Sequence, residues 1–358
     1  MNKNIYILAV MVLSIIRRAN SLEIAVIPIQ EKFSQSETVR VILQLNNTNS
    51  QELLILPWYF PGEELTEPIF DVRCNEKSAR YVGKLMKRVA PKLKQVIHLL
   101  PGQSISTKVN VSSSYRMDET CNYRIRFKPT LERILFKNND ETQEKDKISD
   151  DDYGKISLSS VSTRVYAEGR PDTLIPFDDG TLEQRASGIR YWYCSAGRKS
   201  KIPIAFAEAE SYARDAVNYL STTVPSSTQR FSTWYGTYTL QNWNIVKNKY
   251  TKIYNTLANK FFEFDCFCND PGIYAYVYPD SPYRIYLCGA FWAAPVTGTD
   301  SRAGTIIHET SHFNAVIGTD DHAYGHSRCK NLAKANPTRA RDNADTFEYF
   351  GENTPSLP

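Results

Sequence analysis

Beyond its first twenty residues the chain lacks any apolar run long enough to cross a membrane as a helix, which takes about 20 consecutive apolar residues. It also lacks a strong excess of either charge, because 43 lysines and arginines nearly balance 39 aspartates and glutamates, for a formal net charge of +4 in 358 residues. So small an excess gives no reason to expect a nucleic-acid or membrane partner. A third absence is the C-x-x-C pair of small zinc modules, so the seven cysteines do not indicate a zinc knuckle.

The N-terminus has the pattern of a secretory signal. Lys3 precedes an apolar run over residues 5–16, which is too short to span a bilayer. Ala19 and Ser21 place small residues at the two positions that a signal peptidase reads, so residues 1–21 would be removed. We therefore expect a secreted, extracellular protein, and we expect it to act as a monomer.

The most informative motif is His308-Glu309-Thr310-Ser311-His312. Two histidines four residues apart on a helix project onto one face, where both imidazoles can ligate one metal ion. Glu309 lies at the edge of that face, where its carboxylate can take a proton from an activated water. The motif arises by chance in about one in a hundred chains of this length, and an amphipathic helix with two surface histidines would look the same. Its interpretation as a zinc hydrolase site therefore depends on the residues C-terminal to the helix.

A catalytic zinc site needs a third protein ligand and one open position. We expect the helix to end at residues 316–317 and the chain to turn back at the glycines that come next. That turn can return a carboxylate from Asp320 or Asp321 to the metal, with His322 as a competing ligand; the spacing favours an aspartate without choosing between the two. Tyr324 can donate a hydrogen bond to the reacting carbonyl.

The histidine motif followed by Gly-Thr-Asp-Asp-His-Ala-Tyr-Gly over residues 318–325 resembles the deuterolysin or aspzincin metalloendopeptidases. Residues 276–279, 286–292, 298–301, 343–345 and 348–350 are similar to the peptidyl-Lys metalloendopeptidase branch, and the resemblance covers residues 194–355. It implies Zn²⁺ as the cofactor, and it implies these roles: His308, His312 and Asp321 as metal ligands, Glu309 as general base, and Tyr324 as the residue that stabilises the oxyanion.

Seven cysteines in a secreted chain indicate disulfides and one remaining thiol, but spacing alone does not give the connectivity. The family resemblance implies the pairs Cys194–Cys266 and Cys268–Cys288. Cys74 and Cys121 are then left to pair within the N-terminal region, and Cys329 remains as a free thiol.

The length exceeds what one compact core usually organises, and the residue pattern changes along it. Residues 22–175 contain alternating runs typical of short strands, which predict an all-β sandwich domain. Part of it, over residues 81–91, is similar to a segment ahead of the catalytic domain in relatives, so we interpret the domain as a propeptide. Residues 137–152 are crowded with polar and charged side chains and predict a solvated loop. Residues 176–190 are predicted to be a linker or processing region.

Residues 191–358 show helical periodicity, with one core-facing helix expected over residues 206–220 and another within residues 229–254. A hairpin of residues 273–278 and 284–287 precedes the histidine motif, and such a strand can pair with an extended substrate. The expected fold class is therefore multidomain: an all-β sandwich, propeptide-like domain followed by an α+β, zincin-like and mostly helical metallopeptidase domain.

Asp345 and Glu348, three residues apart on a predicted helix, can form an acidic pocket. Spacing alone favours a solvated acidic helix face, but the family resemblance implies that the pair binds a lysine that follows the scissile bond. Lys87 of the N-terminal region is a candidate to occupy this pocket, since it has the charge that the pocket would select. No lysine lies between Lys155 and Arg190, so an enzyme that cuts only before lysine cannot make that junction itself.

These features predict a secreted zinc endopeptidase that hydrolyses internal bonds of proteins and peptides by Glu309-assisted attack of water, with a preference for lysine after the cut. One alternative is a non-catalytic secreted binding protein with a structural zinc site and a functional β-sandwich. Another is a metalloenzyme that acts on a non-peptide bond. An open metal position beside an ionisable glutamate favours an enzyme, because structural zinc sites close their shell with cysteine and histidine.

Overall fold

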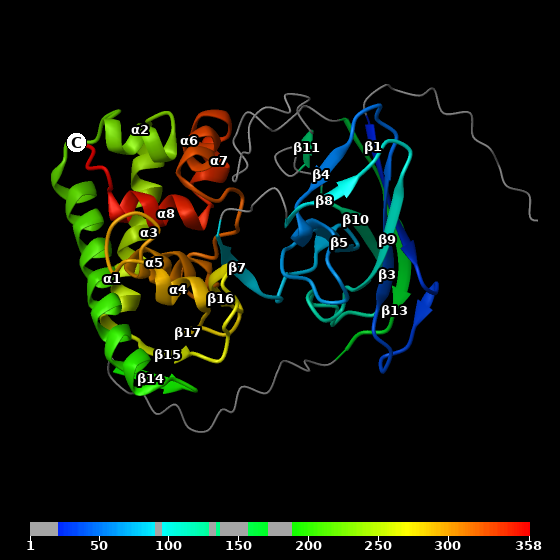
Figure 1. Ribbon diagram of the computed structural model, residues 1–358, viewed down its shortest axis with the longest axis horizontal. Helices are drawn as coiled ribbons and strands as arrows, with labels where there is room; N and C mark the ends of the chain where they lie inside the picture. Colours follow the sequence, from blue (N-terminus) through cyan, green and yellow to red (C-terminus); the bar gives the residue numbers. More distant parts are fainter. Residues whose placement is uncertain (1–20, 90–94, 129–133, 137–156, 171–187) are drawn as a thin grey trace, which may run out of the picture.

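The computed structural model describes residues 21–89, 95–128, 134–136, 157–170 and 188–358. The predicted signal peptide, the 137–152 loop and most of the 176–190 linker lie outside the described residues, and those predictions are not tested. Two hydrophobic cores divide the rest into an N-terminal domain, residues 21–170, and a C-terminal domain, residues 188–358 (Figure 1). Among the described residues no helix combines the length and apolarity needed to cross a membrane.

The N-terminal domain is built almost entirely from strands, in agreement with the all-β prediction. Its sheets have the orders β12-β1-β3-β9, β2-β13-β10-β5-β6 and β11-β4-β8. In β3 every second side chain is buried, as the alternating sequence predicts. The elements are β1 (Ser21–Pro28), β2 (Lys32–Phe33), β3 (Arg40–Asn47), β4 (Leu53–Ile55), a 3-10 helix (Pro57–Tyr59), β5 (Phe70–Cys74), β6 (Lys77–Ser78), β8 (Ile97–Leu99), β9 (Ser104–Asn110), β10 (Cys121–Phe127), β11 (Ile134–Phe136), β12 (Ser157–Val161) and β13 (Thr163–Ala167).

The C-terminal domain packs helices against one mixed sheet whose order is β14-β15-β17-β16-β7. The predicted hairpin is formed by β16 and β17, which run antiparallel. The elements are β14 (Gly188–Trp192), β15 (Phe261–Asp265), β16 (Ile273–Val277), β17 (Arg284–Leu287), α1 (Ala196–Thr222), α2 (Gln229–Tyr235), α3 (Leu240–Asn259), α4 (Gly289–Ala293), α5 (Arg302–His312), α6 (His326–Ala335), α7 (Pro337–Ala340) and α8 (Ala344–Glu352). β14 thus begins inside the segment that we expected to be linker.

The fifth strand of this sheet comes from the other domain. β7 (Leu85–Arg88) leaves the N-terminal domain and pairs antiparallel with β16, with Lys87 opposite Ala275 and Met86 opposite Tyr276 (Figure 1). The N–H of Val89 extends the pairing by donating to the carbonyl of Gly272. A segment nearly 200 residues distant in sequence therefore completes the edge of the C-terminal sheet.

Two helix boundaries differ from the prediction. The helix expected within residues 229–254 is divided into α2 and α3, because Gly236 takes a φ of 73° and a side chain there would collide with the carbonyl oxygen of Ala333. The side chain of Thr239 then caps α3 by accepting from the N–H of Asn242. The histidine helix α5 ends at His312, four residues earlier than expected, and residues 313–317 form turns.

α5 and α8 pack against each other inside the C-terminal domain. At their contact stands Gly304, where a Cβ would collide with the side chains of Glu352 and Glu348 on α8. Glu352 also accepts from the N–H and hydroxyl of Ser301, the residue that caps α5. The two helices therefore pack closely at this point.

The cysteines pair as expected. The disulfides are Cys74–Cys121, Cys194–Cys266 and Cys268–Cys288, and Cys329 is a buried free thiol. The first bridge lies in the N-terminal domain and the other two lie in the C-terminal domain. Each domain is thus cross-linked by its own disulfides, and no disulfide joins the two domains within the described residues.

Candidate active site

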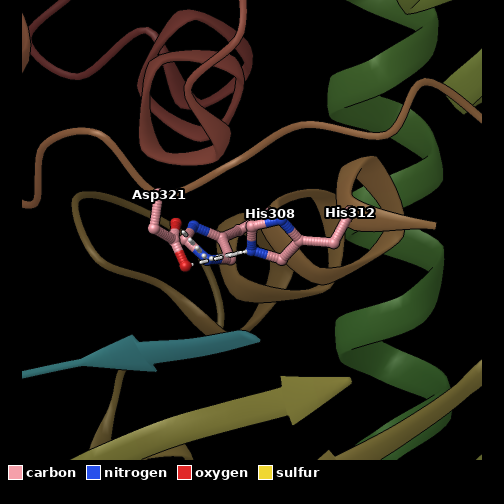
Figure 2. Close-up of side chains that lie close together, drawn as sticks. All are labelled: His308, His312 and Asp321. Atoms are coloured by element: carbon pink, nitrogen blue, oxygen red, sulfur yellow. Dashed lines mark hydrogen bonds and ion pairs between the residues drawn. The ribbon is translucent and has the colours of Figure 1, made fainter. Parts of the chain in front are cut away.

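Three side chains converge on one point beside α5. The Nε2 atoms of His308 and His312 lie 3.1 Å apart, and the carboxylate of Asp321 lies 3.4 Å from the first and 3.3 Å from the second (Figure 2). Ligand atoms about 2.0–2.2 Å from one tetrahedral ion lie roughly 3.3–3.5 Å from each other. The three groups can therefore hold a single zinc ion.

The acceptor atoms nearest to the two Nδ1 atoms indicate the direction of the histidine lone pairs. Nδ1 of His308 lies 2.8 Å from Oδ1 of Asp345, and Nδ1 of His312 lies 2.7 Å from the carbonyl of Thr319. Both partners are acceptors, so each Nδ1 carries the proton and each Nε2 presents a lone pair to the other. Two lone pairs facing each other at this distance are a cation site.

Unpartnered buried atoms support the same conclusion. Within the described part of the chain, both carboxylate oxygens of Asp321 and both of Glu309 are buried without a hydrogen-bond partner. Leaving such groups unsatisfied is costly, and a metal ion bound by Asp321 with a water beside Glu309 would give both carboxylates a partner. The site residues thus fit zinc.

The turn after α5 decides among the three candidate ligands. Asp321 is directed to the histidines, whereas Nε2 of His322 lies 3.2 Å from Oδ2 of Asp342. Asp320 stands with His322 and Asp342 in a separate, half-buried group. The geometry therefore brings together the residue that the family resemblance implied and leaves its two neighbours outside.

Glu309 and Tyr324 both contact the backbone of β7. Burial raises the pKa of Glu309 to about 8, and this rise is partly opposed by the charge of His312 and, to a smaller extent, by the backbone of Lys87, which faces the carboxylate. The hydroxyl of Tyr324 lies 2.9 Å from the carbonyl oxygen of Met86 and 3.0 Å from Oε1 of Glu67. Burial raises the pKa of Tyr324 well above its ordinary value, so the hydroxyl keeps its proton and can donate it.

The acidic pocket predicted at Asp345 and Glu348 is present, and it is occupied. Nζ of Lys87 lies 2.7 Å from Oε2 of Glu348, 3.3 Å from Oδ1 of Asp300 and 3.5 Å from Oδ1 of Asp345. Only 1% of the Lys87 side chain is exposed. Burial alone would lower the pKa of Lys87, but the nearby carboxylates raise it well above its ordinary value, so the ammonium stays charged.

Two tyrosines complete the pocket, with the Lys87 ammonium 5.0 Å from the ring centroid of Tyr274 and 5.6 Å from that of Tyr349. The Tyr349 hydroxyl also donates to Oδ1 of Asp300 at 2.7 Å. Asp300 takes a φ of 52°, and 40% of its side chain is exposed. Three carboxylates and two tyrosine rings thus surround the Lys87 ammonium.

Sequence reasoning missed three features of this site. Asp300 lies in the segment that carries the family resemblance, but nothing in its spacing assigned it to the lysine pocket. Asp345 was assigned to the pocket alone, although its Oδ1 also contacts His308. Glu67 carried no signal, because its place beside Tyr324 follows only from the docking of the two domains.

Comparison with known proteins agrees with this geometry. Residues 220–352 match the sequence profile of the aspzincin family, described as lysine-specific metallo-endopeptidase. An extracellular protease of Aeromonas hydrophila is 38% identical over 325 residues, which are 90% of this chain and 90% of the relative. This chain belongs to the aspzincin family. The aspzincin is a zinc metalloendopeptidase, and its substrates are proteins or peptides.

Further relatives of this aspzincin are peptidases of the same kind. A peptidyl-Lys metalloendopeptidase of Armillaria mellea is 33% identical over 332 residues, covering 89% of this chain and 88% of the relative. One of Pleurotus ostreatus is 48% identical over 165 residues, covering 46% of this chain and 96% of the relative. A solved zinc peptidase from Grifola frondosa is 43% identical and covers 46% of this chain and 100% of that chain, with a TM-score of 0.44. The Armillaria mellea and Pleurotus ostreatus relatives are named as enzymes, which favours an enzyme over a non-catalytic binding protein.

Proposed function

We propose that this aspzincin is a secreted endopeptidase that cleaves immediately before lysine, and that its N-terminal domain is a propeptide that keeps it latent. The observation that carries the proposal is β7, whose Lys87 occupies the acidic pocket while its backbone pairs with β16. Relatives named peptidyl-Lys metalloendopeptidase and extracellular protease support the specificity and the secretion. The signal-like residues 1–21 add to the second point.

In the proposed mechanism His308, His312 and Asp321 hold the zinc ion. When bound, zinc acidifies a water molecule and polarises the scissile carbonyl. Glu309 takes a proton from the attacking water and returns it to the leaving nitrogen. The Tyr324 hydroxyl donates to the carbonyl oxygen as negative charge develops there.

The lysine preference follows from the pocket. A compact ammonium can approach all three carboxylates, whereas a planar guanidinium fork fills a short pocket poorly. The ion pairs form away from water, where hydrogen bonds to charged groups are stronger than on an open surface. Asp345 and Glu348 would therefore select lysine over both neutral residues and arginine.

The latency follows from competition for the same positions. Lys87 lies where a substrate lysine would lie, and β7 covers the strand that an extended substrate would use. A substrate can bind only after β7 has left. The N-terminal domain would thus inhibit the enzyme until it is removed.

A cleavage-site profile tests the specificity. The zinc-loaded full chain and a shortened chain that begins at Gly188 are each incubated with a peptide library, and the new termini are identified by mass spectrometry. We expect the shortened chain to cut before lysine and the full chain to be much slower. Cuts spread evenly over several residue types would contradict the lysine preference, and equal rates for the two chains would contradict latency.

A further inference from the structure

β7 lies in the active site, where its backbone and its lysine make the contacts that the proposed function assigns to a substrate. It runs antiparallel to β16, its lysine side chain fills the acidic pocket, and the carbonyl that precedes the lysine faces Tyr324. The backbone of Lys87 faces Glu309. The bond between Met86 and Lys87 therefore stands where a bond cleaved before lysine would stand.

The same hydroxyl that would assist cleavage has a second acceptor. Tyr324 has one hydroxyl proton, and it can give that proton either to the carbonyl of Met86 at 2.9 Å or to the carboxylate of Glu67 at 3.0 Å. Hydrogen bonds to an ionised acceptor are roughly twice as strong as those to a neutral carbonyl, so the carboxylate is the preferred partner. Glu67 thus withholds the donor from the carbonyl.

Glu67 is held in this position by the strand that it protects. Oε1 of Glu67 lies 3.4 Å from Nε of Arg88, the residue that follows Lys87, and a second nitrogen of Arg88 donates to the carbonyl of Thr66 at 3.3 Å. The Arg88 guanidinium also lies 4.9 Å from the ring centroid of Trp58. The Glu67 side chain is fully buried, so water does not compete for it.

We propose that Glu67 is a positioning residue that protects the Met86–Lys87 bond, and that its removal converts the N-terminal domain from an inhibitor into a substrate cleaved at that bond. This inference rests on the proposed function. The reaction is hydrolysis: water adds to the carbonyl carbon of Met86, the bond to the Lys87 nitrogen breaks, and the products are a Met86 carboxylate and a new Lys87 amino terminus. No other reactant is needed.

A nicked chain would stay in one piece. The disulfide Cys74–Cys121 joins residues on either side of the bond, and β5 remains paired with β10 across the same division. Cleavage would therefore be visible only after reduction of the disulfides. This property separates a cut at Met86–Lys87 from general degradation of the domain.

The test follows the full, zinc-loaded chain over time on reducing and non-reducing gels, with N-terminal sequencing of the fragments. In Glu67→Gln, which keeps the shape but loses the charge, we expect cleavage at Met86–Lys87 to be faster than in the wild type by a factor of up to about 10² to 10³, the range that one oxyanion donor contributes. Glu67→Ala should be cleaved at least as fast. The unreduced sample should still run as one band.

Three controls make the result specific. Glu64→Gln alters an exposed carboxylate three residues away, whose ion pair is with Lys84, and should leave the chain intact. Glu67→Gln combined with Glu309→Gln should also stay intact, since the cut requires the chain's own active centre. Thermal unfolding of Glu67→Gln in the Glu309→Gln background should begin at a lower temperature than that of Glu309→Gln alone, because the buried Glu67–Arg88 ion pair is lost, but the chain should remain folded at the temperature of the assay.

The outcomes separate this proposal from the proposed function. If the shortened chain cuts library peptides before lysine while Glu67→Gln and Glu67→Ala remain whole, the role of Glu67 is wrong and the proposed function stands. Cuts before several lysines of the N-terminal domain, in place of one cut before Lys87, would show that the substitution only loosens the fold of that domain. This result would also overturn the proposed role of Glu67. If the shortened chain shows no preference for lysine, both the proposed function and the proposed role of Glu67 are wrong.

Discussion

The metal centre and the lysine pocket are neighbours in the C-terminal domain, yet their charges are balanced in different ways. The proposed metal centre takes two histidines and one carboxylate from α5 and the segment after it, all within one domain. The pocket gathers three carboxylates, and the ammonium that neutralises them belongs to the N-terminal domain. The chemical machinery is therefore complete within the C-terminal domain, whereas the pocket is complete only when a lysine enters it.

One residue belongs to both regions. Oδ1 of Asp345 lies 2.8 Å from Nδ1 of His308 and 3.5 Å from the Lys87 ammonium. The ionised form of Asp345 is stabilised by these neighbours and by the N–H of Gly325, and its pKa is lowered despite burial, which alone would raise it. Substitutions in the two regions, taken from the largest expected effect to the smallest, test how separable the regions are.

The metal centre should lose its chemistry without losing its ion when its base is removed. In the shortened chain, Glu309→Gln preserves shape and removes the proton acceptor, so we expect kcat to fall by a factor of about 10² to 10⁴. Zinc content should remain at the wild-type level. Metal analysis and a peptide assay on the same sample provide the measurement, and turnover close to that of the wild type would exclude Glu309 as the base.

Removing a ligand should do the reverse and empty the metal centre. Asp321→Ala should lose zinc on dialysis against a weak chelator, because only two protein ligands remain. Asp320→Ala and His322→Ala are the matched controls and should retain it, since both residues stand in the separate group with Asp342. Greater loss of zinc from His322→Ala than from Asp321→Ala would show that the third ligand is misassigned.

The pocket should respond to the loss of its cation. In the full chain, Lys87→Ala leaves three buried or half-buried carboxylates without a partner, and breaking a buried ion pair costs about 3–5 kcal/mol. β7 should then dissociate more readily, and the full chain should hydrolyse a small lysine reporter peptide faster. Lys77→Ala, whose side chain is 77% exposed, is the control and should change nothing. An unchanged rate for Lys87→Ala would mean that latency does not depend on this lysine.

Substitutions of Asp345 and of Glu348 should differ in their effect on zinc binding. In the shortened chain, Glu348→Gln should weaken cleavage before lysine by about 1.5–3 kcal/mol, the range for hydrogen bonds to charged groups, and leave zinc binding intact. Asp345→Asn should weaken lysine recognition and also lower zinc affinity by a factor of about 10 to 100, since it disturbs the partner of His308. Zinc titrations of both variants decide the matter. Equal zinc affinities would show that Asp345 serves the pocket alone.

Asp300 should contribute least. Its side chain is 40% exposed, so solvent screens its attraction for the ammonium, and Asp300→Asn should lower kcat/KM for lysine peptides by less than about fivefold. The comparison with Glu348→Gln, measured on the same reporter, ranks the two carboxylates. A larger loss in Asp300→Asn would place the main lysine contact at the pocket entrance.

The sequence predicted those parts of the site that lie close together in the chain. The spacing of His308 and His312 on one helix needs no tertiary information, and the turn carrying Asp321 comes within ten residues. The apolar pattern nevertheless continued past the true end of α5, because Phe313 and Val316 are buried in a turn. Periodicity reports which side chains are buried and does not report which backbone groups are bonded as a helix.

Features that depend on the docking of the two domains could not be predicted from the sequence. The charge of Lys87 suggested where it could bind, but residues 85–88 show no alternation that would predict a strand, and their partner β16 lies nearly 200 residues away. The partner of Tyr324 at Glu67 depends on the same docking. Long-range pairing of this kind leaves no local pattern in the sequence.

The contact at Gly304 bears on the length of the side chain that the site accepts. α5 carries His308 and His312, α8 carries Asp345 and Glu348, and the side chains of Glu352 and Glu348 lie where a side chain at Gly304 would stand. The distance from the proposed metal centre to the lysine pocket then depends on how these two helices pack. Such a site measures the length of a side chain as well as its charge, so an amine on a shorter stem, as in ornithine, would be recognised as the wrong size even though it carries the right charge.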